Sequence, residues 1–398
     1  MYKTADIYII DAKRTPVGKL YGSLASVRPD DLISGLISGF FQSNKQLVST
    51  ELDALILGCG NQAGEDNRNI ARMAVLLCGL PHNAYAATVN SLCSSGLDAV
   101  LQAARMIACG EADFCLAGGV ETMSRSPFIE SRTDGTHEDS TLGWRFTNDR
   151  ITDFIPTHSM PETAELLSKK YSISRAEQDN YAFLSRNRYE SALKSGFYNN
   201  EILPIFTKNK KMLLDRDEQH RILSLTLLEQ LPTLVKSGTH ITLGNSARIG
   251  DGAAIVALAS GNYIKKHNIQ PLARIAAMSN AAEHPDLMGM SGISALMKAS
   301  KHSGINISDI DLFELSEAFA VQILAAEKEG LADLSKINTK GGSISIGNPL
   351  GMGAARLLTT LLNQLNSDKT LKYGAAASGA GLGTGAAIIL ENLISKPI

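Results

Sequence analysis

The fold of this chain is decided by VNSLCSSGLDAVLQAARMI (Val89–Ile107), where a short apolar run, a turn of small residues and a helix-like stretch follow one another. The same order returns in GGSISIGNPLGMGAARLLTTL (Gly341–Leu361). A polar lead into a strand precedes each copy, STELDALILG (Ser49–Gly58) and NISDIDLFEL (Asn306–Leu315), and a strand rich in glycine and alanine follows each. We therefore predict strand, tight turn and helix in both segments, and a duplicated domain.

Short β-branched runs alternate with longer helical stretches along the chain. The predicted strands include Ile7–Ile10, Ala54–Leu57 and Phe114–Ala117, and the predicted helices include Asn69–Cys78 and Gly96–Ala108. Strands that alternate with helices are typical of an α/β fold.

The composition excludes several classes of protein. Hydrophobic residues make up 44% of the 398 residues, charged residues make up 20%, and the formal net charge is -2, so no global field would recruit nucleic acid or acidic lipid. The five cysteines form no C-x-x-C pair, which argues against a disulfide framework or a zinc site. No leader and no membrane-spanning run is recognisable. We expect a cytoplasmic protein without metal, membrane or nucleic-acid partners, which binds small molecules or its own copies.

Residues 120–248 differ from the rest because they are more polar and contain charged stretches such as Lys208–Lys211 and Asp215–His220. An insertion of this length usually supplies a lid or a binding surface, although a solvated appendage is the alternative. We predict an N-terminal half from 1–119 together with 249–270, a loop domain at 120–248, and a C-terminal half at 271–398.

Cys93 lies where the first repeated segment turns from strand to helix. Backbone N–H groups and the positive helix end would lower the pKa of a thiol there and make it a better nucleophile, whereas the alternative is a small buried packing residue. The glycine-rich turn Gly379–Gly385 has the spacing G-x-G-x-G-x-G, which differs from that of dinucleotide-binding turns, and no Walker-type lysine follows a glycine loop. NAD binding and nucleotide hydrolysis are therefore not favoured.

The sequence resembles the thiolase family through nearly its whole length. The resemblance is carried, in family order, by the cysteine turn, the glycine-rich end and the motifs RTPVGKLYG (Arg14–Gly22), GGVETMS (Gly118–Ser124), SEAFA (Ser316–Ala320) and GGSISIGNPLGMGAAR (Gly341–Arg356). The stretch Ala63–Pro81 is similar to thiolases that split β-ketoadipyl-CoA. The resemblance implies a duplicated five-layered α/β/α/β/α thiolase fold with a loop domain, assembly as homodimers or homotetramers, and coenzyme A thioesters as substrates without a permanently bound cofactor.

The resemblance also assigns roles to single residues. Cys93 would take the acyl group, while Asn348 stands at the family's histidine of G-H-P, Ser378 at its second cysteine, and Ser316 at its asparagine of N-E-A-F. Arg221 would contact the adenine of coenzyme A, with Leu231 on the same surface. The other implied substrate or coenzyme A contacts are Met160, Ala247, Met288 and Phe319. Ala247 and Arg248 replace a usual Ser-Gly pair, and Gly292 replaces a proline.

The replacements at positions 348 and 378 bear on the chemistry. Asn348 keeps an N–H donor for an oxyanion but cannot accept a thiol proton, and the Ser378 hydroxyl is too weak an acid for Claisen chemistry. Loss of a positioned acid or base typically costs about 10² to 10⁴ in rate. Three interpretations stay open: a thiolase-type acyltransferase with weakened Claisen and thiolysis activity, a pseudoenzyme that binds acyl-CoA or a partner subunit, and an enzyme in which another residue such as His284 serves as base.

Overall fold

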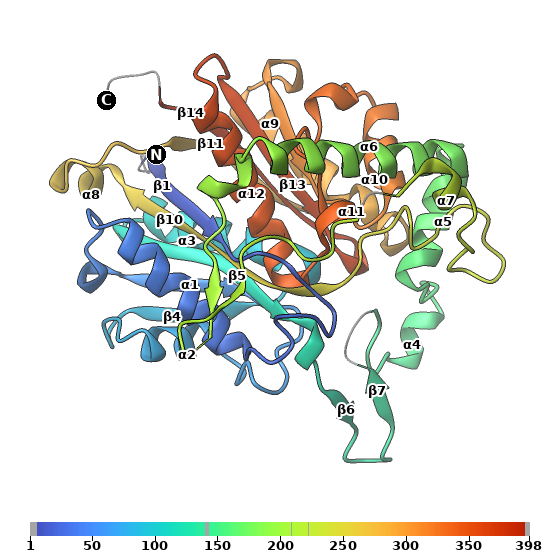
Figure 1. Ribbon diagram of the computed structural model, residues 1–398, viewed down its shortest axis with the longest axis horizontal. Helices are drawn as coiled ribbons and strands as arrows, with labels where there is room; N and C mark the ends of the chain where they lie inside the picture. Colours follow the sequence, from blue (N-terminus) through green and yellow to red (C-terminus); the bar gives the residue numbers. More distant parts are fainter. Residues whose placement is uncertain (1–5, 140–142, 208, 222, 395–398) are drawn as a thin grey trace.

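Two β-sheets run through the molecule and join into one hydrogen-bonded path (Figure 1). The computed structural model describes residues 6–139, 143–207, 209–221 and 223–394. The strand order is β12-β13-β14-β11-β1-β10-β5-β3-β4, and the join is made by Tyr8 with Arg274 and Ile9 with Ala273. The strands of this path are β1 (Ile7–Arg14), β3 (Ala54–Gly58), β4 (Tyr85–Val89), β5 (Phe114–Thr122), β10 (Gly250–Ser260), β11 (Ala273–Ala282), β12 (Leu312–Leu315), β13 (Tyr373–Gly379) and β14 (Thr384–Asn392), and the short β2 (Gly18–Lys19) pairs with β10.

The helices and sheets stack in five layers around three large apolar cores, one between the two sheets and one on the outer face of each sheet. One core lies under α1 (Pro29–Ser43), α2 (Ile70–Leu77) and α8 (Gly261–Lys266) on the outer face of the first sheet. The central core contains α3 (Ser95–Ala108) and α12 (Leu350–Ser367) between the sheets, and the third lies under α9 (Ser291–Ser303) and α10 (Ala320–Lys328) on the outer face of the second sheet. The predicted α/β/α/β/α order is confirmed.

Small residues allow the two central helices to touch. A Cβ added at Gly96 would lie 2.5 Å from the backbone oxygen of Gly351, so only glycine fits where α3 crosses α12. Every residue of α12 from Leu350 to Leu365 is buried, as expected for a helix enclosed by sheets on both sides. This crossing brings the N-terminal ends of both helices to one place.

The two repeated segments differ in one element. The first begins at the last residue of β4 and continues with a turn and α3, and the polar leads Ser49–Glu51 and Ile307–Asp309 both form a 3₁₀ turn before a strand. In the second segment, however, the expected strand is wrong, because residues Ser343–Ile346 form the short helix α11. The backbone N–H of Ile344 donates to the buried carboxylate of Glu317, a long-range partner that favours the helical turn. The described second sheet therefore lacks a counterpart of β4.

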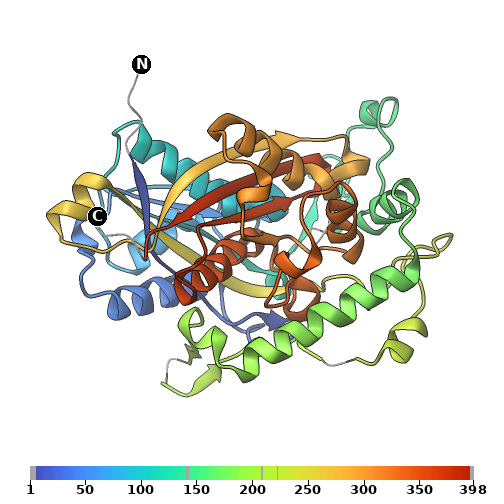
Figure 2. The ribbon, with the colours of Figure 1, turned by 90° about the horizontal axis from the view of Figure 1, so that it is seen from above.

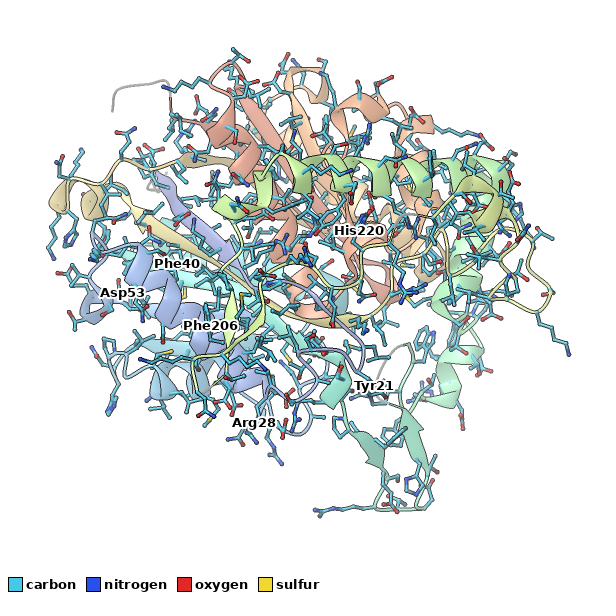
Figure 3. The ribbon with its side chains drawn as sticks, in the orientation of Figure 1. Tyr21, Arg28, Phe40, Asp53, Phe206 and His220 are labelled. Atoms are coloured by element: carbon cyan, nitrogen blue, oxygen red, sulfur yellow. The ribbon has the colours of Figure 1, made fainter. Side chains whose placement is uncertain are left out.

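The segment between β5 and β10 covers the second half of the chain. It contains α5 (Met160–Lys170) and the long helix α6 (Arg175–Lys194), which runs along one side of the molecule in Figure 2. His220 lies against α6 in Figure 3, with its Nε2 2.8 Å from Oε2 of Glu190. The remaining elements are β6 (Phe128–Glu130), β7 (His137–Asp139), α4 (Asp149–Thr152), β8 (Ile205–Phe206), β9 (Met212–Leu214) and α7 (Leu225–Glu229). We propose the division at 120–248 as the extent of this insert.

Candidate active site

Cys93 lies in a 3₁₀ turn, Leu92–Ser94, between the end of β4 and the start of α3. Only 9% of the residue is exposed, and its neighbours in a small apolar cluster are Met123, Leu350 and Ala380. Leu92 adopts φ +50°, a strained value for a non-glycine residue of the kind that clusters at functional sites. The turn therefore presents the thiol to loops of the C-terminal half.

The pKa of the Cys93 thiol is raised to about 11, so the expectation of a lowered value is wrong. Burial is the main cause, followed by the negative charge of Glu121. Hydrogen bonds from the Gly381 backbone N–H, the Cys93 N–H and the Asn348 side chain lower the pKa, but they only partly offset the increase that burial causes. The helix start is present, but the described lining residues include no lysine or arginine, and the helix start alone does not outweigh desolvation.

Glu121 links the two halves behind the thiol. Its fully buried carboxylate accepts hydrogen bonds from the backbone N–H groups of Gly60 at 2.7 Å and Gly351 at 2.9 Å. Gly351 belongs to the first turn of α12, so this carboxylate holds α12 against the end of β5. The residue stands in the GGVETMS motif, but the sequence offered no sign that its charge would act on Cys93.

Asn348 is held next to Cys93 by its own backbone. Its N–H donates to the Arg248 carbonyl oxygen at 2.7 Å, and Gly347 before it adopts φ +101°, which favours glycine. A Cβ added at Gly353 would lie 2.3 Å from Oδ1 of Asn348, so that glycine makes room for the amide. The amide therefore faces the thiol as a hydrogen-bond donor, in the place expected from the sequence.

Ser378 and Ser316 come together at the end of β13. The Ser378 carbonyl oxygen accepts a hydrogen bond from the Ser94 hydroxyl at 2.9 Å, which places position 378 beside the cysteine turn. The Ser378 hydroxyl is buried and has no hydrogen-bond partner among the residues that the structure describes. The Ser316 hydroxyl accepts from the Gly379 N–H at 3.2 Å. A Cβ at Gly292 would lie 2.7 Å from the Ser378 carbonyl carbon, so a residue without a side chain fits against this strand end.

A pocket opens at Cys93 and is mostly apolar. It is lined by Leu92, Cys93, Gly143, Trp144, Pro156, His158, Met160, Thr163, Pro285, Asp286, Met288, Leu350, Gly381 and Leu382. Cys93 and Leu92 come from the first half, Trp144 and Met160 from the insert, and Met288 and Leu382 from the second half. All three parts of the chain therefore contribute walls, and the predicted contacts Met160 and Met288 are placed beside the thiol.

His158 and Asp286 form a polar pair in this otherwise apolar wall. The His158 Nδ1 lies 2.8 Å from Oδ1 of Asp286, and the Trp144 indole N–H donates to the His158 carbonyl oxygen at 3.2 Å. His284, the candidate base named from the sequence, is not among the lining residues, and its Nδ1 accepts a hydrogen bond from the Asp286 N–H. Sequence reasoning missed His158 and Asp286, because 128 positions separate them and neither belongs to a repeated motif.

The remaining predicted contacts lie away from the thiol. Ala247 donates its N–H to the Ala318 carbonyl oxygen at 2.9 Å, and the neighbouring Phe319 is buried in the core of the second half. Arg221 is exposed in the insert, and Leu231 is partly buried just after α7. Neither Arg221 nor Leu231 lines the Cys93 pocket.

Comparison with known proteins identifies the family. The sequence model of the thiolase N-terminal domain matches residues 7–262, and that of the thiolase C-terminal domain matches residues 269–392. The chain belongs to the thiolase family. The β-ketoadipyl-CoA thiolase of Pseudomonas putida is 41% identical over 98% of this chain and 100% of its own length. The acetyl-CoA acetyltransferase of Syntrophomonas wolfei is 35% identical over 98% of this chain and 100% of its own length.

A solved thiolase shares the whole architecture. The crystal structure of human mitochondrial 3-ketoacyl-CoA thiolase in complex with CoA superposes with a TM-score of 0.89 at 33% identity, covering 98% of both chains. The protein is thus an acyltransferase of the thiolase type, and thiolases act on coenzyme A thioesters. The described residues contain no group of three or more metal-ligating side chains and no helix long and apolar enough to cross a membrane.

Proposed function

We propose that this thiolase transfers acyl groups from coenzyme A thioesters through an acyl-thioester on Cys93. The observation that carries the proposal is the position of the thiol, which faces the apolar pocket between the Gly381 N–H and the Asn348 amide. The minor thiolate form of Cys93 would attack the thioester carbonyl, the two donors would stabilise the oxyanion, and the bond between the acyl carbon and the coenzyme A sulfur would break, so that coenzyme A leaves as its thiolate. The acyl group would then pass to an acceptor.

We further propose that Claisen condensation and thiolysis are weak in this chain. Those reactions require proton transfer at the acceptor carbon or at the leaving enolate, and position 378 supplies a hydroxyl instead of a titratable thiol. The Asn348 amide stabilises charge but accepts no proton from Cys93, whose high pKa keeps most of it protonated. An acceptor that is already nucleophilic, such as an amine, a phenol or an acidic carbon, would not need the missing groups.

The relatives named β-ketoadipyl-CoA thiolase and acetyl-CoA acetyltransferase act on acyl-CoA thioesters, and we propose acyl-CoA thioesters as the donors of this chain. For coenzyme A itself, we propose that the insert holds the adenine near Arg221 and Leu231, with pantetheine passing Ala247 and Phe319 toward Cys93. The exposed position of Arg221, outside the Cys93 pocket, agrees with an adenine bound far from the reacting sulfur. Arg221→Ala should therefore weaken coenzyme A binding in calorimetry. A cytoplasmic homodimer or homotetramer completes the proposal.

Intact mass spectrometry after incubation with acyl-CoAs tests the central step. We expect one acyl group per chain, located at Cys93 by peptide mapping and lost in Cys93→Ala. Cys115→Ala serves as the matched control, because Cys115 is also buried but lies in the sheet away from the pocket. An acyl-CoA-binding pseudoenzyme would bind the thioester without gaining mass. Acyl mass on the Cys93→Ala protein would contradict the assigned nucleophile.

A further inference from the structure

The described walls of the Cys93 pocket contain one carboxylic acid side chain but no lysine or arginine. The ionisable side chains among its lining residues are Cys93, His158 and Asp286, and no lysine or arginine is among them. Residues 140–142, which precede Gly143 in the chain, are Ser, Thr and Leu and carry no charge. A negatively charged group placed deep in this pocket would therefore meet no guanidinium or ammonium partner from its described walls.

Asp286 is fixed in the wall by neighbours on both sides. Its Oδ1 lies 2.8 Å from the His158 Nδ1, its Oδ2 lies 3.7 Å from the His284 Nδ1, and its own N–H donates to that Nδ1 at 3.3 Å. The side chains of Asp286 and His158 are 22% and 32% exposed, so the pair faces the opening rather than the core.

We propose that this pair selects the acyl group: the pocket accepts uncharged acyl chains and discriminates against chains that end in a carboxylate. The inference rests on the proposed function, in which the pocket holds the acyl group of the Cys93 thioester. Placing a carboxylate against apolar walls without a cationic partner costs free energy, and the negative charge of Asp286 adds repulsion. Several relatives are named after β-ketoadipyl-CoA or 3-oxoadipyl-CoA, whose acyl chain ends in a carboxylate. The substrates favoured by this chain would therefore differ from the compound in those names.

A matched pair of four-carbon donors tests this selection. Butyryl-CoA and succinyl-CoA differ at the chain end, where a methyl group is replaced by a carboxylate. The rate of Cys93 acylation is measured by mass spectrometry for both donors at the same pH and donor concentration. We expect butyryl-CoA to react faster by about tenfold or more, the size of effect that one uncompensated charge pair produces near a protein surface.

The variant Asp286→Asn removes the charge while keeping the shape of the side chain. It should reduce the ratio of the butyryl-CoA to the succinyl-CoA acylation rate several-fold, mainly by raising the rate of succinyl transfer. The matched control is Asp333→Asn, which removes an equal charge from an exposed helix cap outside the pocket and should leave the ratio unchanged. Faster reaction with succinyl-CoA in the unmodified protein, or an equal change in both variants, would overturn the inference.

Failure of the proposed function is distinguishable from failure of this inference. If neither donor adds mass to Cys93, acyl transfer itself is refuted, and the dissociation constants of the same two thioesters are compared by calorimetry instead. Tighter binding of butyryl-CoA that disappears in Asp286→Asn would still support the selection. Equal or tighter binding of succinyl-CoA in the unmodified protein would refute it.

Discussion

At the scale of single residues, glycines leave room for the polar side chains of this site. Gly353 leaves space for the Asn348 amide, and Gly292 packs against the backbone of Ser378. The glycines that shape the surrounding turns are kept, so the backbone that would carry a histidine at 348 and a cysteine at 378 is in place. The proposed loss of proton transfer therefore lies in the side chains and not in the backbone.

We expect Asn348→His together with Ser378→Cys to raise thiolysis of acetoacetyl-CoA, which should be weak or absent in the unmodified protein. The new imidazole would accept the Cys93 proton, and the thiol would replace a hydroxyl that makes no hydrogen bond, so its insertion breaks no contact. Because the two groups act on one reaction coordinate, each single change should do little and the pair much more.

Steady-state thiolysis at saturating coenzyme A measures this gain, and Cys93→Ala in the doubly substituted background controls for other thiols. The residues Ser316, Ala247, Arg248 and Gly292 still limit the gain, since a displacement of about 1 Å can cost roughly a hundredfold. Thiolysis by the unmodified chain at about 1 to 10³ per second, the ordinary range of enzyme turnover, would contradict the prediction of weak activity.

The raised pKa of Cys93 predicts a steep pH dependence. With a pKa of about 11, the thiolate is the minor form at neutral pH, and its fraction grows about tenfold for each pH unit below that value. Acylation of Cys93 by a saturating acyl-CoA should therefore rise about tenfold per unit from pH 7 to pH 9. Stopped incubations analysed by mass spectrometry give the rates. A plateau that begins below pH 8 would mean that substrate or enzyme groups lower the pKa of the thiol in the complex.

At the scale of elements, the insert is fastened to the first sheet by one buried cation. The Arg14 side chain at the end of β1 donates to Glu201 at 2.7 Å and to both Asp217 oxygens at 2.7 and 3.0 Å, and none of it is exposed. The two carboxylates raise the pKa of Arg14 despite its burial. The Tyr189 hydroxyl on α6 also donates to Asp217, so the same cluster positions the long helix of the insert.

Replacing Arg14 by leucine should lower the free energy of unfolding by about 3 to 5 kcal/mol, because Glu201 and Asp217 would remain buried without a cation. The control is Lys266→Leu, since Lys266 is 62% exposed and pairs with Glu51, itself 34% exposed, at the surface, where an ion pair contributes less than about 1 kcal/mol. Urea denaturation followed by circular dichroism compares the two. Similar losses in both variants would show that the cluster adds no special stability.

Local sequence patterns predicted the helices and turns that are stabilised by nearby residues. They failed where a residue far away in the sequence determines the conformation or the pKa. The turn and helix around Cys93 follow from small residues and apolar periodicity, and both helices α2 and α3 lie where they were expected. The segment at Ser343 has an equally apolar run but folds as a helix against Glu317, which no local pattern reveals. The raised pKa of Cys93 likewise depends on Glu121 and on burial by the second half. The pairing of His158 with Asp286 requires the finished fold.

At the scale of the whole molecule, the two ends of the strand path differ. At one end, β12 is bridged beyond the sheet by Ile337 next to Phe313. At the other end, β4 is the last strand, and the described residues place no further bridge beside it. Tyr85 at its start is 58% exposed. An open edge of this kind invites pairing with another chain, so β4 is the part of the molecule best suited to meet a second copy.

We therefore expect the protein to form a homo-oligomer in which β4 pairs with β4 of a second copy. Light scattering after gel filtration should give a mass that is a multiple of 42.5 kDa. A lysine on an edge strand opposes such pairing through charge repulsion and desolvation, so Tyr85→Lys should raise the dissociation constant about tenfold or more in sedimentation equilibrium. Met297→Lys is the control, because Met297 is 50% exposed on the outer helix α9, away from both sheet edges. A monomer at all concentrations would refute the oligomer, and an equal effect of both lysines would place the interface elsewhere than β4.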